Sequence, residues 1–174
     1  MALRLFFKIN MKKTLQVINQ LKEKKLIEDY AIGGGIGALF YIEPILTYDL
    51  DVFILVSPRF KKGDLILLSP IYDYLKKYPR QREHIIIEGI PVQFIPANGL
   101  EAEAIKTAKE IKYRGVKTKV LRAEYLIALF LKSGRRKDKE KVNMLLEQTK
   151  IDKRKLKKIL ENYSLKGKLK VLKP

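Results

Sequence analysis

The segment from residue 32 to residue 56 constrains the fold of this 174-residue chain most strongly. It opens with three consecutive glycines at 33–35 and closes with an apolar, β-branched and aromatic run at 52–56, which predicts a buried strand. Asp49 and Asp51 stand two residues apart at the start of that strand. Because successive side chains of a strand alternate between its two faces, both carboxylates point the same way.

Two neighbouring carboxylates with no basic residue between them repel each other, and a divalent cation relieves this repulsion. Ligands that are all oxygen atoms suit magnesium. If the glycines at 33–35 turn into a helix, their backbone N–H groups can hold a phosphate. The hypothesis is metal-dependent chemistry on a nucleotide; the alternative is an acidic strand end beside a simple glycine loop.

The net charge points to an anionic partner. The chain has 37 Lys and Arg against 19 Asp and Glu, a formal net charge of +18. This excess predicts attraction to nucleic acid, nucleotides or an acidic protein partner. A lysine- and glutamate-rich surface of a heat-adapted protein is the alternative, but it does not explain so large an excess over acids.

Several classes of protein are excluded by composition. The chain has no cysteine, so disulfides, thiolate catalysis and cysteine zinc sites are absent. Its one histidine, His84, adjoins an apolar run and is interpreted as a surface residue at a strand end. There is no run of about 18 uncharged apolar residues, and residues 1–10 do not resemble a secretory signal. We expect a cytoplasmic protein in which residues 1–10 are an extension ahead of Met11.

Hydrophobic periodicity predicts the elements. Helical spacing predicts helices over 13–28, 36–41, 70–78, 99–110, 123–132, 138–148 and 152–163, with Thr14 and Asn98 as N-caps. Strands are predicted over 30–32, 47–56, 84–88, 91–95 and 116–121, with a hairpin turn at Gly89-Ile90. Residues 59–68 are ambiguous, with 64–68 a candidate helical turn.

This order of elements predicts an α/β (α+β) fold with a mixed sheet and flanking helices. We expect an α/β core over residues 1–121 and a helical part over 122–164. From residue 150 on, ten basic residues stand against two acids. Residues 165–174 are predicted to be a mobile basic tail.

Two motifs resemble the nucleotidyltransferase superfamily related to DNA polymerase beta. They are Ile-Gly-Gly-Gly-Ile-Gly-Ala-Leu-Phe at 32–40 and Thr-Tyr-Asp-Leu-Asp-Val-Phe at 47–53. Glu-Tyr-Leu-Ile-Ala-Leu at 124–129 and Gly-Arg-Arg-Lys-Asp at 134–138 resemble the helical segment of small prokaryotic members, including toxins of the AbiEii type. The resemblance spans about residues 30–148.

The resemblance implies a glycine turn that holds a triphosphate and strand acids that bind one or two magnesium ions. A nucleoside monophosphate would then be transferred by in-line displacement. The positions that match the family's phosphate- and metal-binding residues are Gly34, Gly35, Thr47, Asp49 and Asp51.

The chain departs from the family pattern at the third acid. The matching triplet is Val-Gln-Phe at 92–94, so Gln93 stands where a carboxylate is expected. A glutamine can ligate through its carbonyl oxygen but cannot act as a base. Glu88, at the end of the partner strand, is the alternative third acid.

The helical motif also leaves alternatives open. Phe130 stands where AbiEii-type proteins often carry a lysine, and Lys132 is expected on the opposite side of the helix. Arg135 and Lys137 are candidate ligands of the triphosphate or the acceptor. Asp138 is either catalytic or a helix N-cap.

The leading functional hypothesis is a protein that binds a nucleoside triphosphate with magnesium and transfers a nucleoside monophosphate to RNA, such as tRNA, or to a protein. The alternative, favoured by Gln93, is a catalytically degenerate fold that acts as a nucleic-acid-binding or toxin–antitoxin interaction module. A modifier of small cationic molecules, of the aminoglycoside type, is disfavoured by the basic charge.

Overall fold

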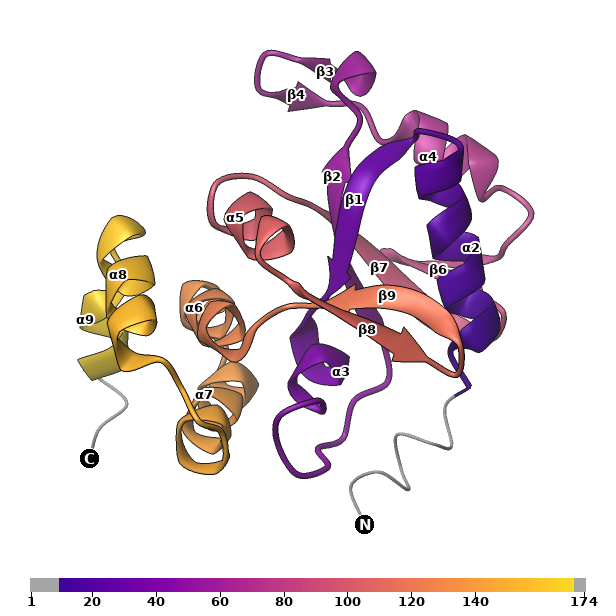
Figure 1. Cartoon of the computed structure of the whole chain (residues 1–174). Coiled ribbons are helices and arrows are strands. Elements are labelled where there is room, and N and C mark those ends of the chain that lie inside the picture. The colour runs from indigo at the N-terminus through magenta and orange to yellow at the C-terminus, as the bar shows by residue number, and fades with distance from the viewer. Residues whose placement is uncertain (1–9, 171–174) are drawn as a thin grey trace.

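The computed structural model describes residues 10–170, whose strands form one mixed sheet with helices on both faces (Figure 1). The strands of this sheet are β1 Ile27–Ile32, β2 Leu50–Val56, β5 Arg80–Gln81, β6 His84–Ile87, β7 Ile90–Pro96, β8 Lys109–Tyr113 and β9 Val116–Val120. Their order across the sheet is β5-β6-β7-β2-β1-β9-β8. The predicted α/β fold is confirmed, while the predicted N-terminal extension lies almost wholly in residues 1–9, outside the described residues.

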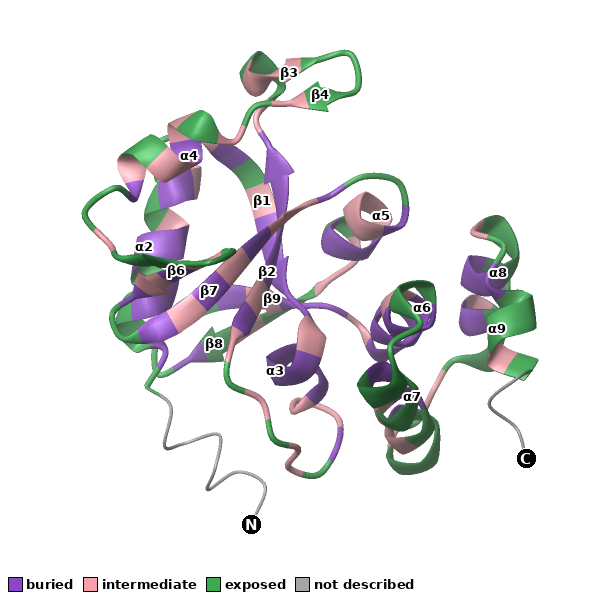
Figure 2. Cartoon of the chain, turned by 180° about the vertical axis from the view of Figure 1, so that it is seen from behind, coloured by how far each residue is buried: buried purple, intermediate pink, exposed green. Residues whose placement is uncertain are grey.

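Strand β2 lies in the middle of the sheet and is buried along nearly its whole length (Figure 2). It pairs antiparallel with β1 and parallel with β7, and the second pairing places Asp51 opposite Gln93. Paired residues of neighbouring strands point to the same face of a sheet. The side chains of Asp51 and Gln93 therefore lie side by side on one face.

Two hydrophobic cores cover the two faces of the sheet. On one face, Val52 and Ile54 pack with α2 (Lys12–Glu23) and α4 (Ser69–Tyr74). On the other face, Phe53 and Leu55 pack with α5 (Leu100–Lys106) and α6 (Ala123–Ser133). Asp51 precedes Phe53 by two residues, so it faces the α6 side.

The C-terminal helices belong to this second core. Besides α6, they are α7 (Arg136–Gln148), α8 (Lys153–Asn162) and α9 (Lys166–Lys170), and a short helix α3 (Gly34–Ala38) follows β1. The core includes Leu145 of α7 and Leu160 of α8. Leu165 is also buried, so part of the segment predicted to be a mobile tail is helical and packed. Within residues 10–170, no helix is long and apolar enough to cross a membrane.

Two further predictions of local structure are wrong. Residues 64–68 do not form a helical turn, because β3 (Lys61–Lys62) and β4 (Leu65–Ile66) make a small antiparallel hairpin. The helix predicted over 99–110 ends at Lys106, and β8 follows it. The β8–β9 turn has positive φ at Arg114 (47°) and Gly115 (85°), the twist that suits a tight hairpin.

The turn of the β6–β7 hairpin lies one residue earlier than predicted. Its turn is Glu88-Gly89, both with positive φ (52° and 81°), rather than Gly89-Ile90. Moving the turn by one residue changes the cross-strand partner of each residue by two positions, so the side chains keep their face but meet different neighbours. Glu88 thereby leaves the strand and occupies the turn.

Both predicted N-caps are also wrong. The N-cap of α5 is Gly99 and not Asn98, and that of α2 is Met11. Thr14 lies within α2, fully buried, and its hydroxyl donates a hydrogen bond of 3.0 Å to the carbonyl of Ile87. This bond joins α2 to the β6–β7 hairpin.

We predict that Thr14→Val lowers the free energy of unfolding by about 1 kcal/mol, because valine keeps the shape but leaves the Ile87 carbonyl without its buried donor. Urea denaturation of the two proteins measures the difference. Equal stability would show that this bond does not hold the hairpin to α2.

Candidate functional site

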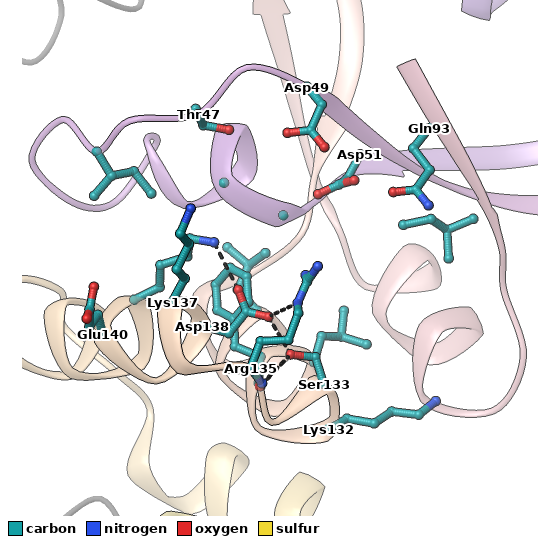
Figure 3. Close-up of a pocket in the computed structure, with 18 of the residues that line it drawn as sticks. Thr47, Asp49, Asp51, Gln93, Lys132, Ser133, Arg135, Lys137, Asp138 and Glu140 are labelled. Atoms are coloured by element: carbon teal, nitrogen blue, oxygen red, sulfur yellow. Dashed lines mark hydrogen bonds and ion pairs between the residues drawn. The ribbon is translucent and has the colours of Figure 1, made fainter. Parts of the chain in front are cut away.

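A cavity of about 1020 Å³ lies between the start of β2, the turn before α3, and the junction of α6 and α7 (Figure 3). All eight residues that the sequence assigns to a site line this cavity. They are Gly34, Gly35, Thr47, Asp49, Asp51, Gln93, Arg135 and Lys137. The fold therefore brings together residues that are up to about a hundred positions apart in the chain.

The glycine turn is packed directly against the acidic strand. Gly34 has a φ of +56°, and a Cβ there would lie 1.7 Å from Oδ2 of Asp51. A Cβ on Gly35 would lie 2.6 Å from Oγ1 of Thr47. Only glycine lets the two side chains come this close to the backbone.

The same turn presents free backbone donors. Gly34 and Gly35 begin α3, so their N–H groups precede the first bond within the helix. In the described part of the chain these two N–H groups have no backbone acceptor. They are suited to bind an anionic oxygen beside Asp51.

The two acids differ in their surroundings. Burial first, and then the neighbouring charge of Asp49, raise the pKa of Asp51 to about 6. The positive charges of Arg135 and Lys141 oppose this rise. The side chain of Asp49 is 41% exposed, at the rim of the strand. The ionised pair is electrostatically unfavourable, and this is the condition that a bound cation relieves.

His84 is closer to the acids than the sequence predicts. Its Nε2 lies 3.3 Å from Oδ2 of Asp49. The observed register pairs Ile85 with Val92, which puts His84 opposite Gln93 and on the same face as Asp51. The turn at Glu88-Gly89 sets this register, whereas the predicted turn at Gly89-Ile90 would pair His84 with Ile95, two positions further along β7.

Glu88 does not serve as the third acid. It lies in the β6–β7 turn, where the hydroxyl of Tyr78 approaches its carboxylate at 3.5 Å, and it does not line the cavity. Across residues 10–170 there is no group of three His, Cys, Asp or Glu side chains placed to hold a metal ion. The donors at the site are two carboxylates and the amide oxygen of Gln93, an all-oxygen set that fits magnesium when phosphate and water complete its coordination.

The opposite wall of the cavity is cationic and is organised by Asp138. This residue is only 1% exposed, and its carboxylate accepts hydrogen bonds from Ser133 Oγ, from Arg135 Nε at 2.9 Å and from Lys141 Nζ at 2.9 Å. Burial raises the pKa of Asp138, but these bonds outweigh it and hold the pKa below its usual value. Asp138 therefore positions the cations, and the prediction that it caps α7 is wrong because Arg135 occupies the N-cap position.

Lys137 and Lys132 also line this side of the cavity. Lys137 extends from the first turn of α7 (Figure 3). Lys132, expected on the opposite side of its helix from Phe130, lines the cavity together with Phe130 and forms an ion pair with Glu101. Ser133 and Lys141 are site residues that sequence reasoning misses; the three-residue spacing of Asp138 and Lys141 on a helix is the one available signal.

Comparison with solved structures identifies the class of fold. The chain is similar to the crystal structure of an antigenic nucleotidyltransferase-like protein from Paracoccidioides brasiliensis, with a TM-score of 0.53 and 17% sequence identity. The match covers 93% of this chain and 91% of that chain. A scan against protein-family models and a search of curated proteins found no match. The fold is therefore nucleotidyltransferase-like, and the AbiEii-type resemblance stays a prediction.

We predict that Gly34→Ala destabilises the protein more than Gly63→Ala. Both glycines have similar positive φ values, +56° and +58°, so alanine at either costs about 1 kcal/mol of backbone strain. Only at Gly34 does the new methyl group overlap a side chain, that of Asp51, because Gly63 has no atom within 4 Å of the corresponding position. Guanidinium denaturation of both variants tests this, and equal losses would contradict the close packing of the turn.

We predict that Asp51→Asn stabilises the metal-free protein at pH 7 by about 3 kcal/mol, since a shift of one pKa unit corresponds to about 1.4 kcal/mol. In the unfolded chain Asp51 loses its proton near pH 4, whereas in the folded protein its pKa is about 6. The folded state thus holds more protons between these values, and wild-type stability falls as the pH rises through that window. Denaturation at several pH values should show the gap between the two proteins opening between pH 4 and 6; a gap that is constant with pH would contradict the burial of an ionised Asp51.

Proposed function

We propose that the protein binds a nucleoside triphosphate with magnesium and transfers a nucleoside monophosphate to an acceptor, with pyrophosphate as the leaving group. The observation that carries this proposal is the packing of Asp51 against Gly34 in a cavity whose opposite wall holds Arg135 and Lys137. Phosphoryl transfer needs three kinds of group. They are carboxylates that bind a cation, free N–H groups that bind a phosphate, and guanidinium or ammonium groups that neutralise the remaining charge. An RNA acceptor such as tRNA fits the net charge of +18, and a protein acceptor is the alternative. We expect a protein with this activity to be cytoplasmic, as its substrates are.

Each residue has a separate role in this proposal. Asp49, Asp51 and the amide oxygen of Gln93 would hold magnesium, which would supply positive charge to neutralise the phosphate oxygens. The N–H groups of Gly34 and Gly35 bind phosphate oxygens. Gln93 cannot take the proton of an attacking hydroxyl, so that proton would pass to solvent or to the carboxylate of Asp49 or Asp51, and we expect slow transfer.

The cations have the complementary role. Arg135 and Lys137 bind the anionic oxygens of the triphosphate across the cavity from the acids. Asp138 holds Arg135 by a 2.9 Å hydrogen bond to Nε, which leaves the two terminal nitrogens of the guanidinium free to face the ligand. This arrangement orients the charge before a ligand arrives.

We predict that Asp51→Asn abolishes magnesium-dependent binding of ATP, because it removes the charge of the buried carboxylate while keeping its shape. Isothermal titration calorimetry with Mg·ATP measures the effect. Asp64→Asn is the matched control, since Asp64 is exposed in the β3–β4 turn away from the cavity, and it should bind as the wild type does. Unchanged affinity in Asp51→Asn would exclude the proposed site.

A second candidate function is a catalytically degenerate module that binds nucleic acid or a toxin–antitoxin partner. Two observations favour it: Gln93 in place of a carboxylate, and the basic end of the chain. Residues 150–170 contain nine Lys and Arg against two acids, and most of these cations are exposed on α8 and α9. Binding by phosphate neutralisation would weaken steeply with added salt.

We predict that the wild type transfers label from a radiolabelled nucleoside triphosphate slowly, and that Gln93→Asp transfers it faster because the third carboxylate is restored beside Asp51. Label incorporation into total RNA and into protein measures both rates. No transfer by the wild type, together with RNA binding that falls steeply with salt, would select the degenerate module instead.

A further inference from the structure

The loop between α3 and β2 displays two large apolar side chains at the rim of the cavity. Leu46 is 75% exposed and Tyr48 is 72% exposed, the highest values among the large hydrophobic side chains of residues 10–170. Both residues line the cavity. Tyr48 immediately precedes Asp49, so an aromatic ring stands beside the proposed metal and phosphate site.

Tyr48 differs from the other tyrosines of the protein. The chain has nine tyrosines, all of them among the described residues. The other eight form a hydrogen bond or a contact with a cationic side chain, whereas the side chain of Tyr48 has neither within the described structure. Its ring and hydroxyl are largely exposed at the cavity and are not held by such a contact in the described structure.

The loop that carries Tyr48 is anchored on both sides. At its start, the Gln148 side chain accepts a 2.8 Å hydrogen bond from the Glu43 N–H, and the Thr149 hydroxyl donates a 2.9 Å bond to the carbonyl of Tyr41. At its end, Thr47 packs against the backbone of Gly35. Tyr48 is thus exposed on a held loop, and ordering it around a ligand costs little conformational entropy.

The chemistry of the cavity indicates which ligand group would bind against the Tyr48 ring. One end presents the acids, the glycine N–H groups and the cations, which suit a triphosphate with its metal. The rim presents an aromatic ring and the Leu46 side chain, which suit a flat, apolar group attached to that triphosphate. A nucleobase has this form, and stacking on an aromatic side chain is tolerant of base identity because every base has a π-face.

We propose that Tyr48 is the stacking platform for the base of the bound nucleoside triphosphate, with Leu46 contacting the edge of the base. This inference rests on the proposed function, because it requires the triphosphate to lie between Gly34 and Lys137. The inference assigns a contact to the base, which is the part of the ligand that the phosphate and metal contacts do not recognise. It also predicts weak discrimination among the four bases.

The test compares a ligand that has a base with one that lacks it. Binding of Mg·ATP and of Mg·tripolyphosphate is measured by calorimetry for the wild type, Tyr48→Ala and Tyr48→Phe. Tyr48→Ala should weaken Mg·ATP by about tenfold and leave Mg·tripolyphosphate unchanged, and Tyr48→Phe should bind both as the wild type does. Tyr72→Ala, which removes a tyrosine that contacts Arg80 away from the cavity, is the matched control and should change neither affinity.

The contrary outcomes separate this inference from the proposed function. If the wild type binds ATP and tripolyphosphate equally well, or if Tyr48→Ala weakens both alike, the triphosphate site stands and the stacking platform is overturned. If Tyr48→Ala leaves the affinity for Mg·ATP unchanged but weakens binding of an oligonucleotide labelled with fluorescent 2-aminopurine, the ring contacts the acceptor. The inference is then overturned as well. If the wild type binds neither Mg·ATP nor Mg·tripolyphosphate, both proposals fail.

Discussion

The contact between the Asp51 carboxylate and the backbone of Gly34 is the constraint on which the rest of the site depends. It brings the first residues of β2 against the turn that follows β1, although the two strands are joined by a connection of seventeen residues between Ile32 and Leu50. A side chain at Gly34 would separate the two elements. Because the glycine turn and the Asp51 carboxylate are in contact, a ligand that reaches the glycine N–H groups also reaches the carboxylate.

This contact has an electrostatic cost that the remainder of the cavity offsets only in part. Asp51 is buried beside a second carboxylate, so its pKa rises to about 6. Arg135 and Lys141 face the pair, but both also bond to Asp138, whose pKa stays below its usual value. The cations are thus held in place by one buried acid and left able to bind an anion. A cation bound beside the two carboxylates would offset this cost.

The fold could be predicted from the sequence where hydrophobic pattern and turn chemistry agree. Strong local signals come from the β-branched run of β2, the glycines at the start of α3 and the helical spacing of α6 to α8. The pattern is weaker where tertiary pairing decides the structure. Lys109–Tyr113 has three charged residues among five and forms an edge strand because it pairs with β9. A periodicity rule alone extends the preceding helix into this strand.

The residues of the site could be predicted from the sequence, but their interactions could not. Spacing suffices to place Asp49 and Asp51 on one face. The approach of His84 depends on a hairpin register that a turn at Glu88-Gly89 fixes, and Glu88 itself is misplaced when the turn is put one residue later. The burial of Asp138 depends on how α6 and α7 meet at Gly134, which no local pattern reports.

The central claim is that Asp49, Asp51 and the glycine turn form one metal and triphosphate site. A crystal structure with manganese and a non-hydrolysable nucleoside triphosphate analogue tests it most directly, because the anomalous signal locates the metal without reference to the protein atoms. We predict a manganese peak about 2.1 Å from oxygens of both Asp49 and Asp51, with triphosphate oxygens on the N–H groups of Gly34 and Gly35. A triphosphate bound elsewhere, or a peak that neither carboxylate contacts, would contradict it.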